Sequence, residues 1–277
     1  NTHRRYQISS KALLRFFGSK TLDNIKSEDV EKFKVWRATQ KRLPHGKKRK
    51  ARRAQPIRPA TINRELALLK HLFNRNDELI PRNPVRKGKA SLLDEDNRQT
   101  RVLNSEEEKL YLLAASQPLQ DIAKLMLETG MRPEEVYRIS RQNVFVDQGY
   151  LFNPYGKTKA ARRKVPLSTA ACNVLLKRLN NEKIKGEFLF PGRSTDAPIV
   201  KVNAAHTASV KRCKVKHFRL YDLRHTWATR MVQAGVDLVT LAAMLGHSRI
   251  EMVLRYAHPT EEHQFEAMEK RQRYMAK

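Results

Sequence analysis

Hydrophobic residues in the first third of the chain recur at the spacing of amphipathic helices. The segments that carry this pattern are residues 6–17, 27–36 and 59–72. Pro59 suits the first turn of the third helix, and Pro81 and Pro84 end it because proline cannot continue a helix. We therefore predict that residues 1–93 form a small all-helical domain.

A strongly basic segment interrupts these helices. Eight of the thirteen residues from Lys41 to Arg53 are Lys or Arg, and Pro44 and Gly46 within this segment break helices. The composition predicts an exposed loop or arm. Residues 94–100 offer no apolar side chain for burial, and we interpret them as a linker to a second domain.

The second domain, residues 101–277, contains further helical patterns. Ser105 and Glu108 have the spacing of a capping box, and Ser248 and Glu251 repeat that spacing near the end of the chain. Helical patterns cover residues 105–113, 118–128, 175–179, 223–234, 238–245 and 250–256. We expect the two capping boxes to begin the first and the last of these helices.

A β pattern lies in the middle of this second domain. Val144 and Val146 precede a turn signal at residues 147–149, and the apolar residues 150–152 follow it directly. Residues 164–167 read as a further strand after a basic loop. The predicted fold class is therefore mainly α with a small antiparallel β-sheet.

The net charge of the chain indicates which class of molecule it binds. The chain has 56 Lys and Arg residues against 28 Asp and Glu residues, so its formal net charge is 56 − 28 = +28. Such an excess repels itself in a compact fold and is expected where a polyanion neutralises it. No apolar run approaches the roughly 18 residues that span a bilayer, so nucleic acid is favoured over a membrane.

The cysteines exclude two further classes of site. Cys172 and Cys213 are the two cysteines of the chain, and neither lies in a CxxC pattern. They support neither a disulfide framework nor a zinc site, and they fit a reducing cytoplasm. We interpret both as ordinary core residues.

The carboxy-terminal half contains clusters of residues suited to phosphodiester chemistry. In chain order they are residues 129–135, 156–159, 223–229 and 245–248, followed by Tyr256. Breaking a phosphodiester requires a nucleophile, cations that neutralise the nonbridging oxygens, and an acid for the leaving oxygen. These clusters supply arginine, lysine, histidine and tyrosine, the residue types that can fill those roles.

In their order and spacing these clusters resemble the tyrosine recombinase (phage integrase) family. The specific resemblance covers most of residues 101–260, and the helical segment before it is compatible with the family's core DNA-binding domain. It implies a two-domain clamp around double-stranded DNA that cleaves and rejoins DNA through a 3′-phosphotyrosine intermediate, without metal or nucleotide cofactor. Implied partners are further copies in a synaptic tetramer and accessory DNA-bending or directionality proteins, but no membrane.

The resemblance also implies roles for individual residues. Tyr256 would be the nucleophile, and Arg132 and Arg224 would hold the phosphate through planar, bidentate contacts. Lys157 would protonate the departing 5′ oxygen, and His247 would donate a hydrogen bond to the phosphate. Alternatives stay open for each role: Tyr256 as a half-buried aromatic residue, the two arginines as solvated residues or contacts to other backbone phosphates, His247 as a helix-terminal residue without substrate contact, and a neighbouring lysine in the acid role. Those neighbours are Lys159 and Lys164.

One position departs from the family pattern. The family usually has histidine three residues before the second arginine, and this chain has Tyr221 there. A phenol can donate or accept a hydrogen bond, but it is a poor general base near pH 7. Beside this position, we interpret His225 as a packed, hydrogen-bonded histidine and Glu135 as a structural ion-pair partner.

Two other functions are alternatives to a recombinase. A type IB topoisomerase would share the chemistry but relax DNA without exchanging strands between partners. A helix-turn-helix regulator would use residues 238–256 to read DNA and would never become covalently attached to it. For the recombinase, the basic arm at 41–53 and the cluster Lys211, Arg212, Lys214 and Lys216 are predicted to contact phosphates.

Overall fold

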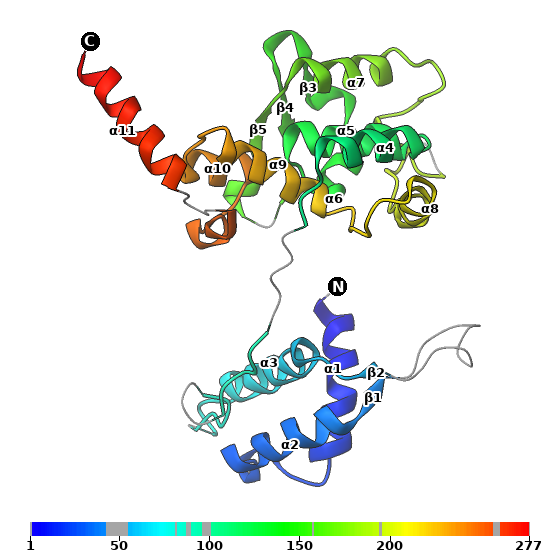
Figure 1. Cartoon of the computed structure of the whole chain (residues 1–277). Coiled ribbons are helices and arrows are strands. Elements are labelled where there is room, and N and C mark those ends of the chain that lie inside the picture. The colour runs from blue at the N-terminus through cyan, green and yellow to red at the C-terminus, as the bar shows by residue number, and fades with distance from the viewer. Residues whose placement is uncertain are drawn as a thin grey trace. The chain divides into compact units, whose positions relative to one another are not determined.

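The chain forms two compact units, each with its own hydrophobic core. A computed structural model describes residues 2–42, 55–80, 82–86, 90–95, 101–156, 158–193, 196–256 and 261–276. The units comprise Asn1–Arg98 and Gln99–Lys277 (Figure 1). Among the described residues no helix combines the length and the apolar character needed to cross a bilayer.

Helices dominate the first unit, as the hydrophobic pattern predicts. Its described elements are α1 (Thr2–Phe17), η1 (Leu22–Asn24), α2 (Ser27–Thr39), β1 (Lys41–Arg42), β2 (Gln55–Pro56) and α3 (Pro59–Arg75). Phe17, Phe33, Leu66 and Phe73 are buried where the three helices meet. The short strands β1 and β2 pair antiparallel, a feature that the sequence did not predict, and residues 43–54 of the predicted basic arm lie outside the described residues.

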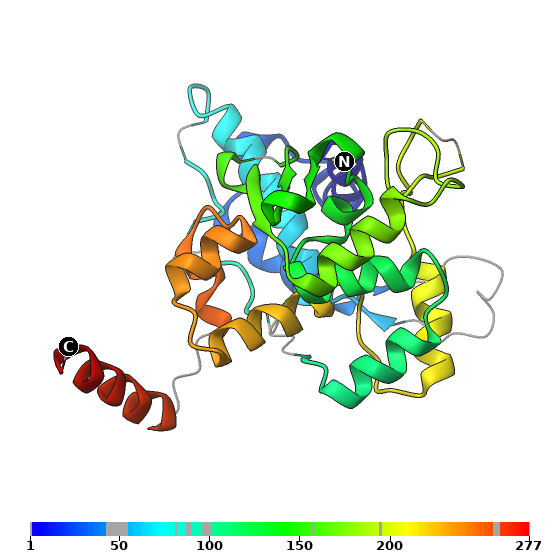
Figure 2. The same cartoon turned by 90° about the horizontal axis from the view of Figure 1, so that it is seen from above.

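The second unit surrounds one central helix. Its described helices are α4 (Ser105–Ala114), α5 (Leu119–Thr129), α6 (Pro133–Tyr137), α7 (Thr169–Leu179), α8 (Asn203–Cys213), α9 (Asp222–Gln233), α10 (Leu238–Leu245) and α11 (Glu261–Met275). Helix α5 packs against α4, α6, α7 and α9, and Leu125 and Met126 in it have no exposed surface. Helix α8 lies beside α4, as both views show (Figure 1 and Figure 2).

A three-stranded antiparallel sheet completes the second unit. Its strands are β3 (Val144–Phe145), β4 (Tyr150–Asn153) and β5 (Arg163–Pro166), in the order β3-β4-β5. Leu151 pairs with Val165, and Asn153 pairs with Arg163. Short 3-10 turns occur at η2 (Arg141–Asn143), η3 (Val146–Gln148) and η4 (Lys159–Ala161). The predicted fold class, mainly α with a small antiparallel sheet, is confirmed.

The predicted capping box at Ser105 and Glu108 is wrong by one residue. The box is formed by Asn104, whose Oδ1 accepts a hydrogen bond from the backbone N–H of Glu107 at 2.8 Å. The Glu107 carboxylate in turn accepts a hydrogen bond from the backbone N–H of Asn104 at 3.2 Å. Glu108 instead accepts a hydrogen bond from Arg230 of α9, a contact that local sequence does not reveal.

The predicted helix at residues 250–256 is also wrong. This segment forms two 3-10 turns, η5 (Ile250–Met252) and η6 (Leu254–Tyr256), and no side chain caps the first of them. Val253 and Tyr256 are buried, which is the spacing of three residues that a 3-10 turn places on one face. The apolar residues of segment 250–256 therefore lie in tight turns. The predicted capping box of Ser248 and Glu251 does not begin a helix.

We predict that the glycine at the end of α5 is required for packing. Gly130 is left-handed (φ +64°), and a Cβ atom there would lie 2.2 Å from Cε3 of Trp227. Gly130→Ala should therefore lower the free energy of unfolding by about 3 kcal/mol, because strain and a clash add.

Gly149→Ala provides the matched control for this glycine. Gly149 is also left-handed (φ +70°), but no atom lies within 4 Å of its added Cβ, so strain alone of about 1 kcal/mol is expected. Urea unfolding followed by circular dichroism measures both losses. Equal destabilisation of the two variants would contradict the packing explanation.

Candidate active site

The first arginine of the site follows directly from the end of helix α5. Gly130 reverses the chain, Met131 is buried, and Arg132 is extended just before Pro133, the first residue of α6. Proline suits this first helical position because its missing N–H has no partner there in any case. The turn therefore presents the Arg132 side chain, and it also directs the Gly130 carbonyl towards α9.

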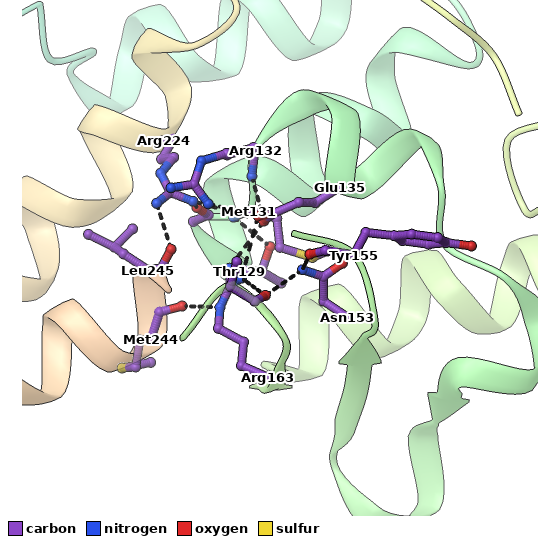
Figure 3. Close-up of polar contacts among 12 residues, drawn as sticks. Thr129, Met131, Arg132, Glu135, Asn153, Tyr155, Arg163, Arg224, Met244 and Leu245 are labelled. Atoms are coloured by element: carbon purple, nitrogen blue, oxygen red, sulfur yellow. Dashed lines mark hydrogen bonds and ion pairs between the residues drawn. The ribbon is translucent and has the colours of Figure 1, made fainter. Parts of the chain in front are cut away.

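The second arginine, Arg224 of α9, is completely buried. Its Nη1 donates to the Gly130 carbonyl at 2.8 Å, and its Nη2 donates to the Leu245 carbonyl at 2.7 Å (Figure 3). Burial lowers the pKa of Arg224 to about 10, so the guanidinium stays charged at neutral pH. Its Nε is buried and has no hydrogen-bond partner in the described part of the chain.

His247 lies directly beside this guanidinium. Its Nε2 is 3.0 Å from Arg224 Nη2, and because a guanidinium can only donate, Nε2 accepts and the imidazole proton is on Nδ1. Burial and then the charges of Arg224 and Arg132 lower the pKa of His247 to about 4. His247 is therefore neutral, and its buried Nδ1–H has no acceptor among the described residues.

Glu135 links Arg132 to a third arginine. Arg132 Nη1 donates to Glu135 Oε1 at 2.8 Å, and Arg163 Nη2 of β5 donates to Glu135 Oε2 at 3.2 Å (Figure 3). Burial alone would raise the pKa of Glu135, but the charges and hydrogen bonds of Arg163 and Arg132 lower it. Burial alone would lower the pKa of Arg132, but the ion pair with Glu135 raises it. The interpretation of Glu135 as an ion-pair residue is confirmed.

Arg163 is a site residue that was not predicted from the sequence. It is 9% exposed, and its Nε donates to the Met244 carbonyl at 2.7 Å while its Nη1 donates to the Ala161 carbonyl at 3.1 Å. Arg163 thus joins the strand β5 to the end of α10 and to Glu135. A signal was present, because Arg163 is in phase with buried Val165 along the strand.

The tyrosine of the site is held by a histidine. The Tyr256 hydroxyl lies 2.7 Å from His225 Nδ1, and both side chains are buried. Burial raises the pKa of Tyr256 to about 12, although Arg224, Arg255 and Arg132 act to lower it. Burial lowers the pKa of His225 to about 4, so the phenol donates and the neutral imidazole accepts.

Tyr221 packs against the same histidine. Its ring meets the His225 ring edge to face, with centroids 5.2 Å apart, and its phenol also raises the pKa of Arg132. The expectation that His225 is packed and hydrogen-bonded is confirmed. Tyr221 therefore lies within the site and contacts the histidine that holds Tyr256.

A pocket of about 450 Å³ opens between the sheet and the end of α10. The described residues that line it include Arg132, Glu135, Gly156, Thr158, Gly246 and His247. A Cβ at Gly246 would lie 2.9 Å from both the Ala160 carbonyl oxygen and Arg163 Nη1, so glycine permits this close approach. Within the described ranges, no group of three His, Cys, Asp or Glu side chains is arranged to hold a metal ion.

The structure brings Arg132, Arg224, His247, Tyr256 and Tyr221 together through these contacts. Lys157 lies outside the described residues. Of its two alternatives, Lys159 is exposed in η4, and Lys164 is exposed with its Nζ 4.4 Å from the centre of the Tyr150 ring. The assignment of the acid therefore stays a prediction.

We predict that Arg163 stabilises the site as well as orienting it. Arg163→Met leaves buried Glu135 with one arginine partner fewer, and should lower the free energy of unfolding of the second unit by about 3 kcal/mol. Urea unfolding followed by Trp227 fluorescence, in a Trp36→Phe background, reports on that unit. The control is Arg162→Met, an exposed neighbour expected to change stability by less than about 0.5 kcal/mol. A similar small change for Arg163→Met would contradict this role.

Comparison with known proteins places this chain in a family. Residues 100–263 match the model of the phage integrase family. The chain is 30% identical over 233 residues to the integrase of Salmonella phage P22, covering 79% of this chain and 59% of that protein. It is 32% identical over 211 residues to the integrase of Escherichia phage P2, covering 75% of this chain and 58% of that protein. It therefore spans less than two thirds of the length of these relatives.

A solved structure shares the fold. An integrase of transposon Tn1549, in complex with a circular intermediate DNA, superposes with a TM-score of 0.73 at 20% identity. The match covers 95% of this chain and 92% of that one. The family model matches more than half of the chain, and the conclusion from sequence and fold together is that this protein belongs to the phage integrase family of tyrosine recombinases.

Proposed function

We propose that this protein is a site-specific DNA recombinase that cleaves and rejoins DNA through a covalent link to Tyr256. The proposal rests on two buried N–H groups without a hydrogen-bond acceptor in the described part of the chain, one on the charged Arg224 side chain and one on the neutral His247 side chain beside it. Arg224 Nε and His247 Nδ1 have no partner among the described residues, although buried N–H groups are nearly always hydrogen-bonded. A phosphate group of DNA supplies the acceptors that both nitrogens lack.

The reaction follows from the groups around this phosphate position. The Tyr256 oxygen attacks phosphorus, the bond to the 5′ oxygen breaks, and a 3′-phosphotyrosine link with a free 5′ hydroxyl results. Arg132 and Arg224 neutralise the nonbridging oxygens, and His247 donates from Nδ1. In our proposal Lys157 gives a proton to the departing oxygen. Attack by a 5′ hydroxyl from another strand reverses the step and rejoins DNA.

The two units are assigned to two tasks in this proposal. Residues 1–93 form the core DNA-binding domain, residues 94–100 the linker, and residues 101–277 the catalytic domain with its tail. The net charge of +28 supports contact with DNA phosphates by both. In the cluster at the end of α8, Lys211, Lys214 and Lys216 are exposed and suit this role. Arg212 instead donates to the Ala114 carbonyl at 2.6 Å and ties α8 to α4.

We also propose that several copies act together on DNA. One structural relative is a λ integrase dimer bound to a core site, which this chain matches with a TM-score of 0.69 at 18% identity. Exchange between two duplexes requires cleavage of four strands, which in this proposal occurs in a tetramer. Accessory DNA-bending or directionality proteins remain further predicted partners.

The alternative functions fit less well. A helix-turn-helix regulator needs a recognition helix after α10, whereas two 3-10 turns follow, with Tyr256 buried in the second. A regulator would also have no use for unpaired buried donors at a phosphate position. A type IB topoisomerase shares the chemistry, and strand exchange between two labelled duplexes distinguishes it from a recombinase.

We predict that Tyr256 becomes covalently attached to DNA. A suicide substrate with a nick near the cleavage point should trap a protein–DNA adduct, because the released fragment diffuses away and rejoining fails. The adduct is measured by denaturing gel electrophoresis. Tyr256→Phe should abolish it, whereas Tyr274→Phe, at an exposed tyrosine of α11, should leave it unchanged. An adduct that persists in Tyr256→Phe would place the nucleophile elsewhere.

A further inference from the structure

We propose that His225 accepts the proton of the Tyr256 hydroxyl when that oxygen attacks phosphorus. The inference rests on the proposed function, and it assigns a reacting group to a residue that the sequence analysis interpreted as structural. Cleavage by a tyrosine requires that the phenol proton leave, and a base within hydrogen-bond distance must receive it.

Geometry favours His225 for this step. Its Nδ1 lies 2.7 Å from the Tyr256 hydroxyl, the hydrogen bond that this hydroxyl makes within the described part of the chain. The two side chains are 6% and 7% exposed, so bulk water does not compete for the proton. His225 also directly follows Arg224 on α9, so the base and the phosphate-binding guanidinium are fixed on one helix.

Nearby groups are poorer acceptors. His247 uses Nε2 to accept from Arg224 and carries its proton on Nδ1. Tyr221 contacts the His225 ring, but a neutral phenol is a weak base. Asp222 accepts hydrogen bonds from the backbone N–H of Arg219 at 2.7 Å and from Arg219 Nη2 at 2.9 Å. Its carboxylate is therefore already engaged.

The surroundings keep the imidazole in the form that can accept. Burial and the positive charges of Arg255, Arg219 and Arg224 lower the pKa of His225, and only Asp222 among these groups opposes them. His225 is thus neutral at physiological pH, and its Nδ1, which already accepts the hydrogen bond from Tyr256, can receive the proton. A bound DNA phosphate adds negative charge beside it, which favours the imidazolium form during attack.

The bonds and protons are accounted for in both cleavage and rejoining. During cleavage the Tyr256 O–H bond breaks, its proton goes to His225 Nδ1, and the oxygen forms a bond to phosphorus. The bond from phosphorus to the 5′ oxygen breaks, and that oxygen takes a proton from the proposed acid Lys157. During rejoining a 5′ hydroxyl attacks phosphorus, and the departing Tyr256 oxygen recovers the proton from the His225 imidazolium.

The decisive variant is His225→Asn. The Asn side-chain oxygen can replace Nδ1 as a hydrogen-bond acceptor, but it cannot take a proton at neutral pH. Under single-turnover conditions with the nicked suicide substrate, cleavage should slow on the order of 100-fold or more while DNA affinity and melting temperature stay close to those of the parent. His217→Asn, at an exposed histidine before α9, is the matched control and should cleave at the parent rate.

A more acidic phenol separates proton transfer from simple positioning. A ring-fluorinated tyrosine placed at position 256 loses its proton more readily and depends less on a base. It should therefore reduce the defect of His225→Asn to less than about 10-fold, measured against the fluorinated parent. A defect of unchanged size would assign His225 a positioning role and overturn the proposal.

Two further outcomes would each overturn a different proposal. Cleavage by His225→Asn at the parent rate would overturn the role of His225 while leaving Tyr256 as nucleophile. Absence of any Tyr256-dependent adduct in the unmodified protein would instead overturn the proposed function itself. The two failures are therefore distinguishable in one set of reactions.

Discussion

The second unit depends on one buried positive charge. Arg224 has no exposed surface, and removing a guanidinium from water is costly unless its donors are satisfied. The Gly130 carbonyl, the Leu245 carbonyl and His247 Nε2 accept from it, and they come from the ends of α5 and α10. The nearest carboxylate contact, to Glu135, is 4.0 Å long. The Arg224 guanidinium is thus held by neutral acceptors rather than by a close carboxylate. Its positive charge therefore remains available to attract an anion.

This charge also sets the protonation states of its neighbours. Burial and the arginine charges keep His247 and His225 neutral, so one imidazole can donate and the other can accept. Burial keeps Tyr256 protonated despite these cations, since its pKa is about 12. Without DNA the proposed nucleophile therefore stays protonated at neutral pH. A phosphate that satisfies Arg224 and His247 would change this balance at the moment of reaction.

The sequence predicted features that depend on neighbouring residues. The turn at Gly149 follows from local chemistry, and the structure has it. Strands β3, β4 and β5 were also predicted, from the apolar residues that flank the turn at residues 147–149 and from residues 164–167. The capping box predicted at Ser105 was misplaced by one residue, because asparagine is as good an N-cap residue as serine and Asn104 comes directly before it.

Features that depend on distant residues escaped prediction. Arg163 meets Glu135 across 28 residues, and His225 meets Tyr256 across 31, so neither pair has a local signal. Helix α8 went unrecognised because its buried face includes the polar residues His206 and Ser209. His206 is satisfied there by the Tyr111 hydroxyl and the Phe218 carbonyl. Such buried polar contacts make sense only once the partner elements are in place.

The most direct test is a crystal structure of the protein on DNA with a vanadate group at the cleavage position, as a mimic of the transition state. We expect Arg224 Nε and His247 Nδ1 each to lie within hydrogen-bond distance of a nonbridging oxygen, with the Tyr256 oxygen in line with the leaving oxygen. A complex in which both nitrogens remain without a phosphate contact would contradict the claim that the buried Arg224 charge forms the phosphate site.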